Sequence, residues 1–203
     1  MFLTDALLAL VYPQSCRVCG GSVEQQRFGV ACESCWRAQI LADQGSIGFY
    51  EGALRETVLL LKRQPYLPRH VVELLWEASK GFGDVSRVVP VPLHTDRLRT
   101  RGFNQAAIIA RELSRALGVP LDETTLVRVS SSDKYRAGLD AKGRRDSVAN
   151  AFAVRHPRVI QGEAILLVDD VFTTGATVSS CSDTLLEAGA KSVVIFALAQ
   201  ARR

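Results

Sequence analysis

The sequence predicts an α/β protein, in which a parallel sheet with helices on both faces follows a small N-terminal module with four cysteines. The segments 164–168 and 192–199 are apolar throughout and alternate with helical patterns, which is typical of parallel strands buried on both faces. Four of the five cysteines lie near the start of the chain, which indicates a separate metal-binding unit. A length of 203 residues suffices for one such domain with a small appendage.

The cysteines have the spacing of a structural zinc site. Cys16 and Cys19 form one C-x2-C pair, and Cys32 and Cys35 form a second pair after a gap of twelve residues. Four thiolates at this spacing can close a tetrahedral site and leave no position open for catalysis. Two disulfides are the alternative, but no feature of the sequence indicates an oxidising compartment. We therefore expect structural Zn2+ in a zinc-ribbon-like module, and a buried Cys181 that packs as a small hydrophobic residue.

The order of the predicted elements sets the domain boundary. We place an N-terminal helix and the cysteine module at residues 1–45, and the α/β domain at residues 46–203. Apolar periodicity and turn residues predict helices over 2–11, 53–62, 68–80, 103–117, 144–149 and 177–188. Strands are predicted over 87–91, 125–129, 152–154, 164–168 and 192–199, with a short strand or connector over 45–52. An exposed loop is predicted over 130–143. Gly118 is expected to cap the helix before it, because glycine readily adopts the left-handed conformation found there.

Charge and hydropathy bear on three further classes of protein: nucleic-acid-binding, membrane-spanning and secreted. Lys and Arg number 25 against 21 Asp and Glu, and the resulting net charge of +4 does not by itself indicate a nucleic-acid-binding protein. No uninterrupted apolar run approaches the ~18 residues of a membrane-spanning helix, so we predict no membrane span. The first residues lack positive charge and include Asp5, unlike a signal peptide, and we therefore expect a cytoplasmic location.

The most informative motif is I-L-L-V-D-D-V-F-T-T-G-A-T, at residues 165–177. A buried strand brings the adjacent carboxylates of Asp169 and Asp170 to its carboxyl end, a short turn follows, and a helix then begins. Ligands of open parallel sheets bind outside the carboxyl ends of the strands, and the backbone N–H groups at a helix start attract phosphate. The turn adds the hydroxyls of Thr173, Thr174 and Thr177 and, at Gly175, a backbone that a ligand can approach closely.

The two carboxylates in this motif point to a sugar phosphate. They cannot face a phosphate directly, and are placed instead for the hydroxyls of an attached sugar or for a hydrated Mg2+. A strand end with a threonine N-cap is the alternative, but it explains only one of the three threonines. The motif therefore predicts a ribose 5-phosphate site.

A second motif carries three arginines after the strand predicted at 87–91. Arg97, Arg99 and Arg101 fall within five residues, and Gly102 and Asn104 open the next helix. Guanidinium groups at this density can hold a diphosphate through bidentate hydrogen bonds. A solvated basic face is the alternative for the arginines, and a simple N-cap is the alternative for Asn104.

Together these motifs resemble the competence protein F family, which joins a four-cysteine zinc module to a type I phosphoribosyltransferase-like, amidophosphoribosyltransferase-like domain. Residues 165–177 resemble the motif that binds 5-phosphoribosyl-1-pyrophosphate (PRPP) in type I phosphoribosyltransferases. The resemblance implies that Asp169 and Asp170 are the catalytic carboxylates, on the ribose 2′- and 3′-hydroxyls, and that Mg2+ arrives with the pyrophosphate. It assigns the 5′-phosphate to Thr173, Thr174, Gly175, Ala176 and Thr177, and the pyrophosphate to Arg99, Arg101, Gly102 and Asn104, within a loop that ends in R-G-F-N-Q.

The same resemblance assigns a flexible lid to the basic segment after the strand predicted at 125–129. Its basic residues include Lys134, Arg136, Arg144 and Arg145. A lid that closes on pyrophosphate would exclude water and protect an activated sugar from hydrolysis.

Two functions remain open on the sequence alone. The first, which we favour, is an enzyme that binds PRPP or a related ribose phosphate, transfers the phosphoribosyl group to a base or an amine, and releases pyrophosphate. The second is a non-catalytic factor in competence and DNA uptake, which would bind single-stranded DNA or the competence machinery through its basic loops. The fold alone does not decide between them.

Overall fold

The computed structural model describes residues 14–41, 45–129 and 151–202, which divide into two compact units. Unit 1 comprises Met1–Gly81, Asp170–Thr173 and Ala197–Arg203, and unit 2 comprises Phe82–Asp169 and Thr174–Phe196. The predicted helix over 2–11, loop over 130–143 and helix over 144–149 lie outside the described residues. Within the described part, no helix is both long enough and apolar enough to cross a membrane.

The main sheet has four strands in the order β1-β6-β5-β2. Its strands are β1 (Ser46–Phe49), β2 (Arg87–Pro90), β5 (Ala164–Phe172) and β6 (Ser192–Gln200). The pairs β1–β6 and β2–β5 are parallel, which confirms the predicted parallel sheet. Ile165, Leu166, Leu167 and Val168 are fully buried, as the unbroken apolar pattern requires.

Unit 1 contains the cysteine module and two longer helices. Its elements are η1 (Gln26–Phe28), α2 (Glu33–Arg37), β1, α3 (Gly52–Leu61) and α4 (Arg69–Ser79). Leu54, Val58 and Leu61 of α3 and Val71 and Leu75 of α4 are fully buried at helical spacing. These side chains supply much of the apolar core of the unit.

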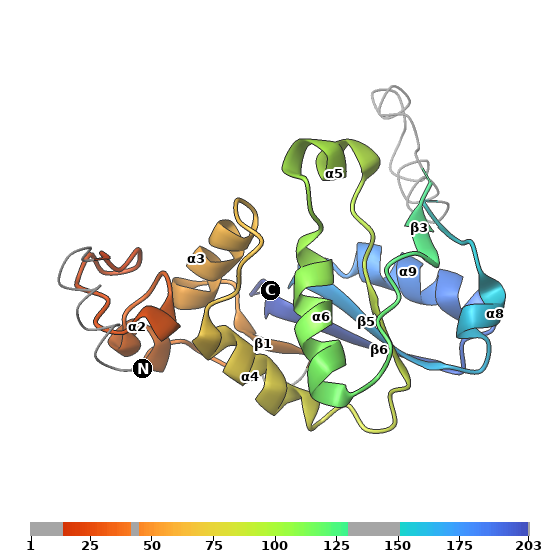
Figure 1. Ribbon diagram of the computed structural model, residues 1–203, viewed down its shortest axis with the longest axis horizontal. Coiled ribbons are helices and arrows are strands. Elements are labelled where there is room, and N and C mark those ends of the chain that lie inside the picture. Colours follow the sequence, from red (N-terminus) through yellow and green to blue (C-terminus); the bar gives the residue numbers. More distant parts are fainter. Residues whose placement is uncertain (1–13, 42–44, 130–150, 203) are drawn as a thin grey trace. The chain divides into compact units, whose positions relative to one another are not determined.

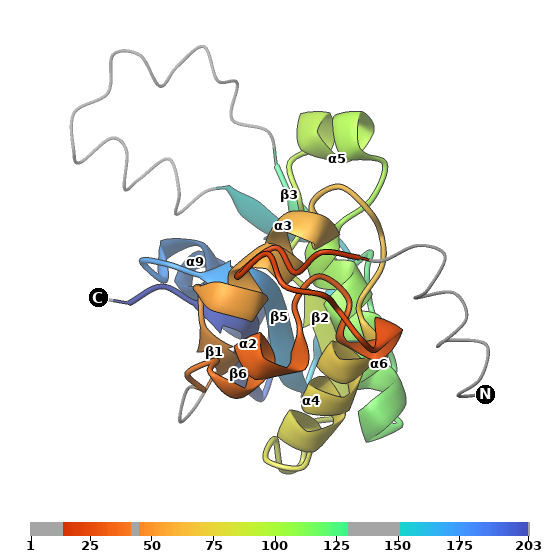
Figure 2. The same cartoon turned by 90° about the vertical axis from the view of Figure 1, so that its left-hand side faces the viewer.

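Unit 2 holds the remaining helices and a small hairpin. Its further elements are α5 (Thr95–Arg101), α6 (Gln105–Leu117), β3 (Leu126–Arg128), β4 (Phe152–Val154), α8 (Pro157–Ile160) and α9 (Ala176–Glu187). Helix α6 lies on one side of the β2–β5 strands and α9 on the other (Figures 1 and 2), so both faces are covered as predicted. Strands β3 and β4 form a separate antiparallel pair. Gly118 ends α6 in the left-handed conformation, with φ 67°, which confirms the predicted cap.

Two local predictions were wrong. The arginine-rich segment, which was expected to be a loop, is the short helix α5. Its start is stabilised by the ring of His94, which accepts a hydrogen bond from the backbone N–H of Asp96, and its end by Gly102 at φ 81°. Strand β5 continues past Val168 to Phe172, whose carbonyl accepts a hydrogen bond from the N–H of Ala201. Both aspartates therefore lie within the strand rather than after it.

Candidate functional site

Strands β2 and β5 run side by side, and β2 ends where β5 continues. Pro90, the last residue of β2, is opposite Val168 in the parallel register, and the N–H of Val91 donates to the carbonyl of Val168 at 2.8 Å. Asp169 and Asp170, which follow Val168 within β5, and the segment that begins at Pro92 therefore lie toward the same edge of the sheet. This edge is where ligands of open parallel sheets bind.

The turn between β5 and α9 exposes the polar groups expected of an anion site. Asp169 and Asp170 are partly buried, and Thr173, Thr174 and Thr177 are exposed. Gly175 is the N-cap of α9 and has φ 83°, a conformation that side chains other than glycine rarely adopt. The hydroxyl of Thr174 accepts a long hydrogen bond of 3.5 Å from the N–H of Ala176. The turn thus places hydroxyls beside the first free N–H groups of a twelve-residue helix.

The pKa of Cys181 on α9 is affected by the nearby carboxylate of Asp169. The thiol is fully buried on α9, which confirms the expectation of a buried cysteine. Burial raises its pKa, and the negative charge of Asp169 raises it further. The carboxylate of Asp169 is therefore close enough to α9 to affect the ionisation of a group inside the helix.

The arginines of the second motif lie on an exposed segment, residues 92–104, which contains α5 and which we call the arm. None of the α5 residues is buried, and α5 lies beyond the end of α6 at which that helix begins (Figure 1). The Arg99 side chain is 78% exposed, and its guanidinium is 4.0 Å from the carboxylate of Asp96. Arg101, which is partly buried, follows at the end of the helix. The arm can therefore present positive charge to a ligand, but its arginines are held loosely.

Asn104 has a structural role in this arm. Its Nδ2 donates to the carbonyl of Val91 at 2.9 Å, and its Oδ1 accepts from the N–H of Ala106 at 3.1 Å. Asn104 is therefore the N-cap of α6, and both ends of the amide are engaged within the protein, whereas its assignment to pyrophosphate stays a prediction. The next residue, Gln105, is 2% exposed, and its Nε2 has no hydrogen-bond partner within the described part of the chain. A buried donor of this kind is costly unless a ligand or water satisfies it.

The four cysteines of the N-terminal module meet at one point. Their Sγ atoms all lie within 4.8 Å of one another, with Cys16–Cys35 at 3.8 Å and Cys19–Cys32 at 3.7 Å. A tetrahedral Zn2+ with Zn–S bonds of about 2.3 Å requires sulfur atoms about 3.8 Å apart. The donor set and its geometry therefore fit a structural metal site with four protein ligands.

A tight backbone turn and nearby hydrogen-bond donors position the cysteine sulfur atoms. Gly20 has φ 77°, and its N–H donates to the carbonyl of Cys16 at 2.8 Å, which closes the turn of the first C-x2-C pair. The N–H of Cys32 points at the sulfur of Cys16 at 3.3 Å. The hydroxyl of Ser34, 3.0 Å from the Cys32 sulfur, is the main cause that lowers the pKa of Cys32 to about 6. These donors favour the thiolate form that a metal requires.

Aromatic rings attach the cysteine module to α4 within unit 1. The ring of His70 makes edge contacts with Phe28, at a centroid distance of 5.0 Å, and with Trp36, at 4.9 Å. Gly29 has φ 66°, and a Cβ there would lie 2.4 Å from the Pro68 ring. No local pattern in the sequence indicates this contact, because His70 is more than thirty residues from both rings. Burial lowers the pKa of His70, so the neutral imidazole is favoured.

The structure thus brings some predicted residues together and leaves others undescribed. The four cysteines converge, and the arginine arm follows the strand that pairs with β5, which carries Asp169 and Asp170. The predicted lid residues Lys134, Arg136, Arg144 and Arg145 lie outside the described residues. The domain boundary at residue 45 stays a prediction.

Comparison with known proteins identifies relatives. Residues 98–203 match the phosphoribosyl transferase domain family. The chain is 31% identical over 196 residues to "Competence protein F" of Haemophilus influenzae, covering 92% of this chain and 84% of that protein. It is 36% identical over 125 residues to "DNA utilization protein YhgH" of Salmonella typhi, covering 62% of this chain and 54% of that protein. A solved glutamine PRPP amidotransferase from B. subtilis matches with a TM-score of 0.43 and 20% identity, over 62% of this chain and 24% of that one.

Proposed function

Because the chain belongs to the competence protein F family and contains a phosphoribosyl transferase domain, we propose that it binds PRPP and transfers its phosphoribosyl group. The observation that carries the proposal is the shared edge of β2 and β5. There the arm that begins at Pro92 follows β2, and Asp169 and Asp170 lie in the last part of the neighbouring parallel strand β5, ahead of the polar turn. This arrangement supports a phosphate cradle and a cationic arm serving one ligand.

The proposed roles follow from the chemistry of each group. Hydroxyls and free N–H groups of residues 173–177 bind the 5′-phosphate, and the carboxylates of Asp169 and Asp170 accept hydrogen bonds from the ribose hydroxyls. Arg99 and Arg101 neutralise the pyrophosphate, which departs as an anion. Asn104 acts as a positioning residue, since both ends of its amide are occupied by the backbone.

In the proposed phosphoribosyl transfer, positive charge develops on the sugar. Departure of pyrophosphate from C1 leaves positive charge on the ribose ring, and the acceptor base or amine then forms the new bond to C1. The nearby carboxylates stabilise that charge electrostatically. Mg2+, which PRPP carries on its pyrophosphate, would supply further charge neutralisation. The carboxylate oxygens of Asp169 and Asp170 are of the type that Mg2+ prefers, and their partial exposure leaves them accessible to it.

We also propose that the cysteine module holds one structural Zn2+. The module supplies four thiolates and no open position, so the ion would stabilise the fold and take no part in catalysis. Thiols of this kind persist in a reducing compartment, which supports the proposed cytoplasmic location.

Calorimetry with PRPP and Mg2+ tests the binding proposal directly. We expect saturable binding to one site per chain. When bases and ammonia are then screened as acceptors, the protein should release pyrophosphate from PRPP with at least one of them. Absence of PRPP binding to zinc-loaded protein would refute the proposal. Binding without pyrophosphate release for any acceptor would remove the enzymatic part.

A second candidate function rests on the exposed arm. Helix α5 presents its arginines with no buried residue, and such a surface suits a phosphodiester backbone as well as a pyrophosphate. The two named relatives are a competence protein and a DNA utilization protein. This chain would then bind single-stranded DNA, or a component of the competence machinery, without chemistry. Fluorescence anisotropy with labelled single strands at several salt concentrations tests it.

A further inference from the structure

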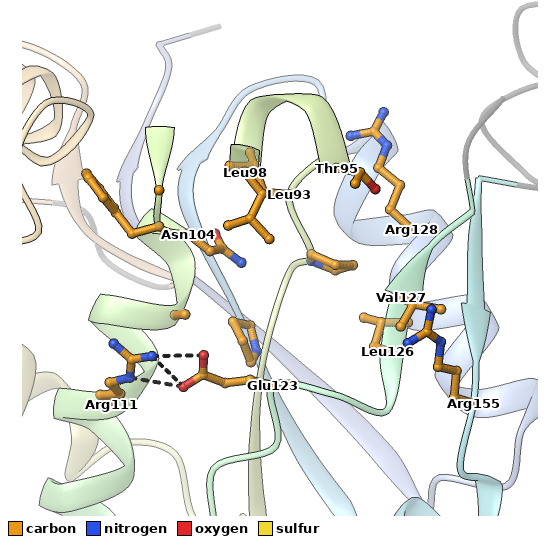
Figure 3. Close-up of a pocket in the computed structure, with 15 residues that line it drawn as sticks. Leu93, Thr95, Leu98, Asn104, Arg111, Glu123, Leu126, Val127, Arg128 and Arg155 are labelled. Carbon is orange, nitrogen blue, oxygen red and sulfur yellow. Dashed lines mark hydrogen bonds and ion pairs between the residues drawn. The ribbon is translucent and has the colours of Figure 1, made fainter. Parts of the chain in front are cut away.

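The cysteine module contains a hollow that opens on one side of the four-sulfur cluster. Its volume is about 280 Å3, and it shares no residue with the cavity of unit 2 in Figure 3, part of whose lining belongs to the arm. Cys19 and Cys32 line the hollow, whereas Cys16 and Cys35 do not. A small molecule that enters the hollow therefore meets one particular pair of sulfur atoms.

The two pairs of cysteines differ in how strongly the protein covers them. The Sγ atoms of Cys19 and Cys32 are 3.7 Å apart, and those of Cys16 and Cys35 are 3.8 Å apart. Cys19 is exposed and Cys32 is partly buried, while Cys16 is only 2% exposed and Cys35 is partly buried. Distance does not distinguish the pairs, but solvent access does, and access is a main determinant of which thiolates are oxidised.

The backbone also leaves the pair at the hollow freer to move. Cys19 lies in a turn, and Cys32 is the N-cap of α2, with an extended backbone at φ −74° and ψ 165°. Cys35 lies inside α2, and the N–H of Cys16 donates to the carbonyl of Gly21 at 2.6 Å. A disulfide has an S–S bond of about 2.05 Å, so each sulfur of the pair Cys19 and Cys32 would move by about 0.8 Å to form one.

The wall of the hollow favours a small, neutral oxidant. Glu24 and Glu33 both line it, and the carboxylate of Glu33 accepts a hydrogen bond from Arg37 at 2.7 Å. Glu24 is exposed and adds negative charge, which repels an anionic oxidant such as glutathione disulfide. Hydrogen peroxide is uncharged at neutral pH and is far smaller than the hollow. A hydroperoxide is therefore the class of oxidant that this hollow admits best.

We propose, on the basis of the zinc site proposed above, that Cys19 and Cys32 are an oxidation-sensitive pair that hydrogen peroxide couples as a disulfide. One thiolate of the pair displaces hydroxide from the peroxide, so that an S–O bond forms and the O–O bond breaks. The other thiolate attacks this sulfur and releases a second hydroxide, and each hydroxide takes up a proton to become water. The two sulfur atoms lose two electrons, which the peroxide gains.

This coupling would remove two of the four metal ligands and leave Cys16 and Cys35 reduced. A site with two thiolates holds Zn2+ far more weakly than a site with four, so the ion would be released. A dithiol reductant would reverse the oxidation by thiol–disulfide exchange and restore the site. The module would thereby act as a reversible peroxide-sensitive metal site.

Peroxide treatment of the full-length, zinc-loaded protein tests the proposal. Zinc is measured first by atomic emission, and protein that never contains zinc would refute the zinc site and this proposal together. One equivalent of peroxide should then release Zn2+ to a chromogenic chelator. Rapid alkylation in denaturant and peptide mapping should find Cys19 linked to Cys32, with Cys16 and Cys35 alkylated. Zinc-loaded protein that keeps its metal in millimolar peroxide would overturn this proposal alone, as would first linkage of any other pair.

A glycine in the wall supplies a variant that keeps all four ligands. A Cβ at Gly21 would lie 3.4 Å from the Cys19 sulfur, in ordinary contact, and the backbone there is not left-handed. Gly21→Ala should therefore retain zinc and slow its release by peroxide severalfold, because the added methyl group covers the exposed sulfur. Gly81→Ala is the matched control, since a Cβ at Gly81 would meet only the carbonyl of Ala78, at 3.6 Å, and Gly81 does not line the hollow.

Equal rates of release from the two glycine variants would show that access through the hollow does not control the oxidation, and would overturn the proposal. Faster release by glutathione disulfide than by peroxide at equal concentration would also overturn it. If Gly21→Ala fails to hold zinc, the peptide mapping on the parent chain still decides which pair is coupled.

Discussion

The side chain of Asn104 connects the start of α6 to the end of β2, through a hydrogen bond of 2.9 Å from its Nδ2 to the carbonyl of Val91. The same side chain caps α6 through the N–H of Ala106. The arm between these points therefore begins and ends on one polar bridge. Any ligand role of the arm depends on this bridge, because it fixes both ends of the arm against the sheet.

Removing the bridge should loosen the arm and destabilise unit 2. Asn104→Ala loses the cap and the bond to Val91, so the free energy of unfolding should fall by about 1–3 kcal/mol. Asn104→Ser is the matched variant, since serine keeps a capping oxygen but is too short to reach the Val91 carbonyl. Denaturant unfolding should rank the serine variant between the alanine variant and the parent chain. Equal stability of all three chains would mean that the bridge contributes nothing.

Asp169 and Asp170 should be required for PRPP binding but not for folding. Asp169→Asn with Asp170→Asn removes two negative charges from partly buried positions and leaves the shape of the side chains unchanged. We expect PRPP binding to be lost in calorimetry, while circular dichroism and thermal stability remain close to those of the parent. An unchanged PRPP affinity in this double variant would exclude these carboxylates from the site.

The arginine arm should distinguish PRPP from a sugar phosphate without pyrophosphate. Arg99→Ala and Arg101→Ala should each weaken PRPP by about tenfold or more, because a charge-assisted hydrogen bond is lost, and should leave ribose 5-phosphate nearly unaffected. If the arm instead serves DNA, each change should lower single-strand affinity and reduce the salt dependence by about one contact. Normal PRPP binding combined with lost DNA binding would favour the second candidate function.

The cysteine module should carry metal. Purified protein should contain about one Zn2+ per chain by atomic emission, and Cys16→Ser should lose it and destabilise the module, because metal binding and folding are coupled. Cys181→Ala is the control, since Cys181 is buried in α9, apart from the four-sulfur cluster, and this variant should keep its zinc. Metal-free protein with paired disulfides would contradict the zinc proposal.

His70 should make stability depend on pH. Burial lowers its pKa below the unfolded value, so the unfolded chain takes up a proton that the folded chain resists as the pH falls below about 6.5. Stability should therefore decline on acidification through this range, and His70→Gln should reduce the decline. His156→Gln is the matched control, because His156 is exposed. Identical melting temperatures of the parent and His70→Gln across pH 5.5–8 would show that the buried ring does not contribute.

The sequence by itself determined the features that depend on local spacing. The four cysteines fall at intervals that short turns can close on one point, and their sulfur atoms do converge. The apolar run 165–168 predicted a strand buried on both faces because solvent-facing positions are missing from it, and those residues are fully buried. The cap at Gly118 could be predicted for a similar reason, since it depends on one residue and the helix before it.

Tertiary structure decided the features whose partners are distant along the chain. Strand β5 extends to Phe172 because its carbonyl is paired with Ala201, a contact that no local pattern around residue 172 contains. His70 is buried because the cysteine module, more than thirty residues away, packs Phe28 and Trp36 on its ring. A cavity of about 460 Å3 in unit 2 exists only where the arm, α6 and the β3–β4 pair meet. Sequence periodicity records which face of an element avoids water, whereas the identity of the group that covers that face depends on how the whole chain folds.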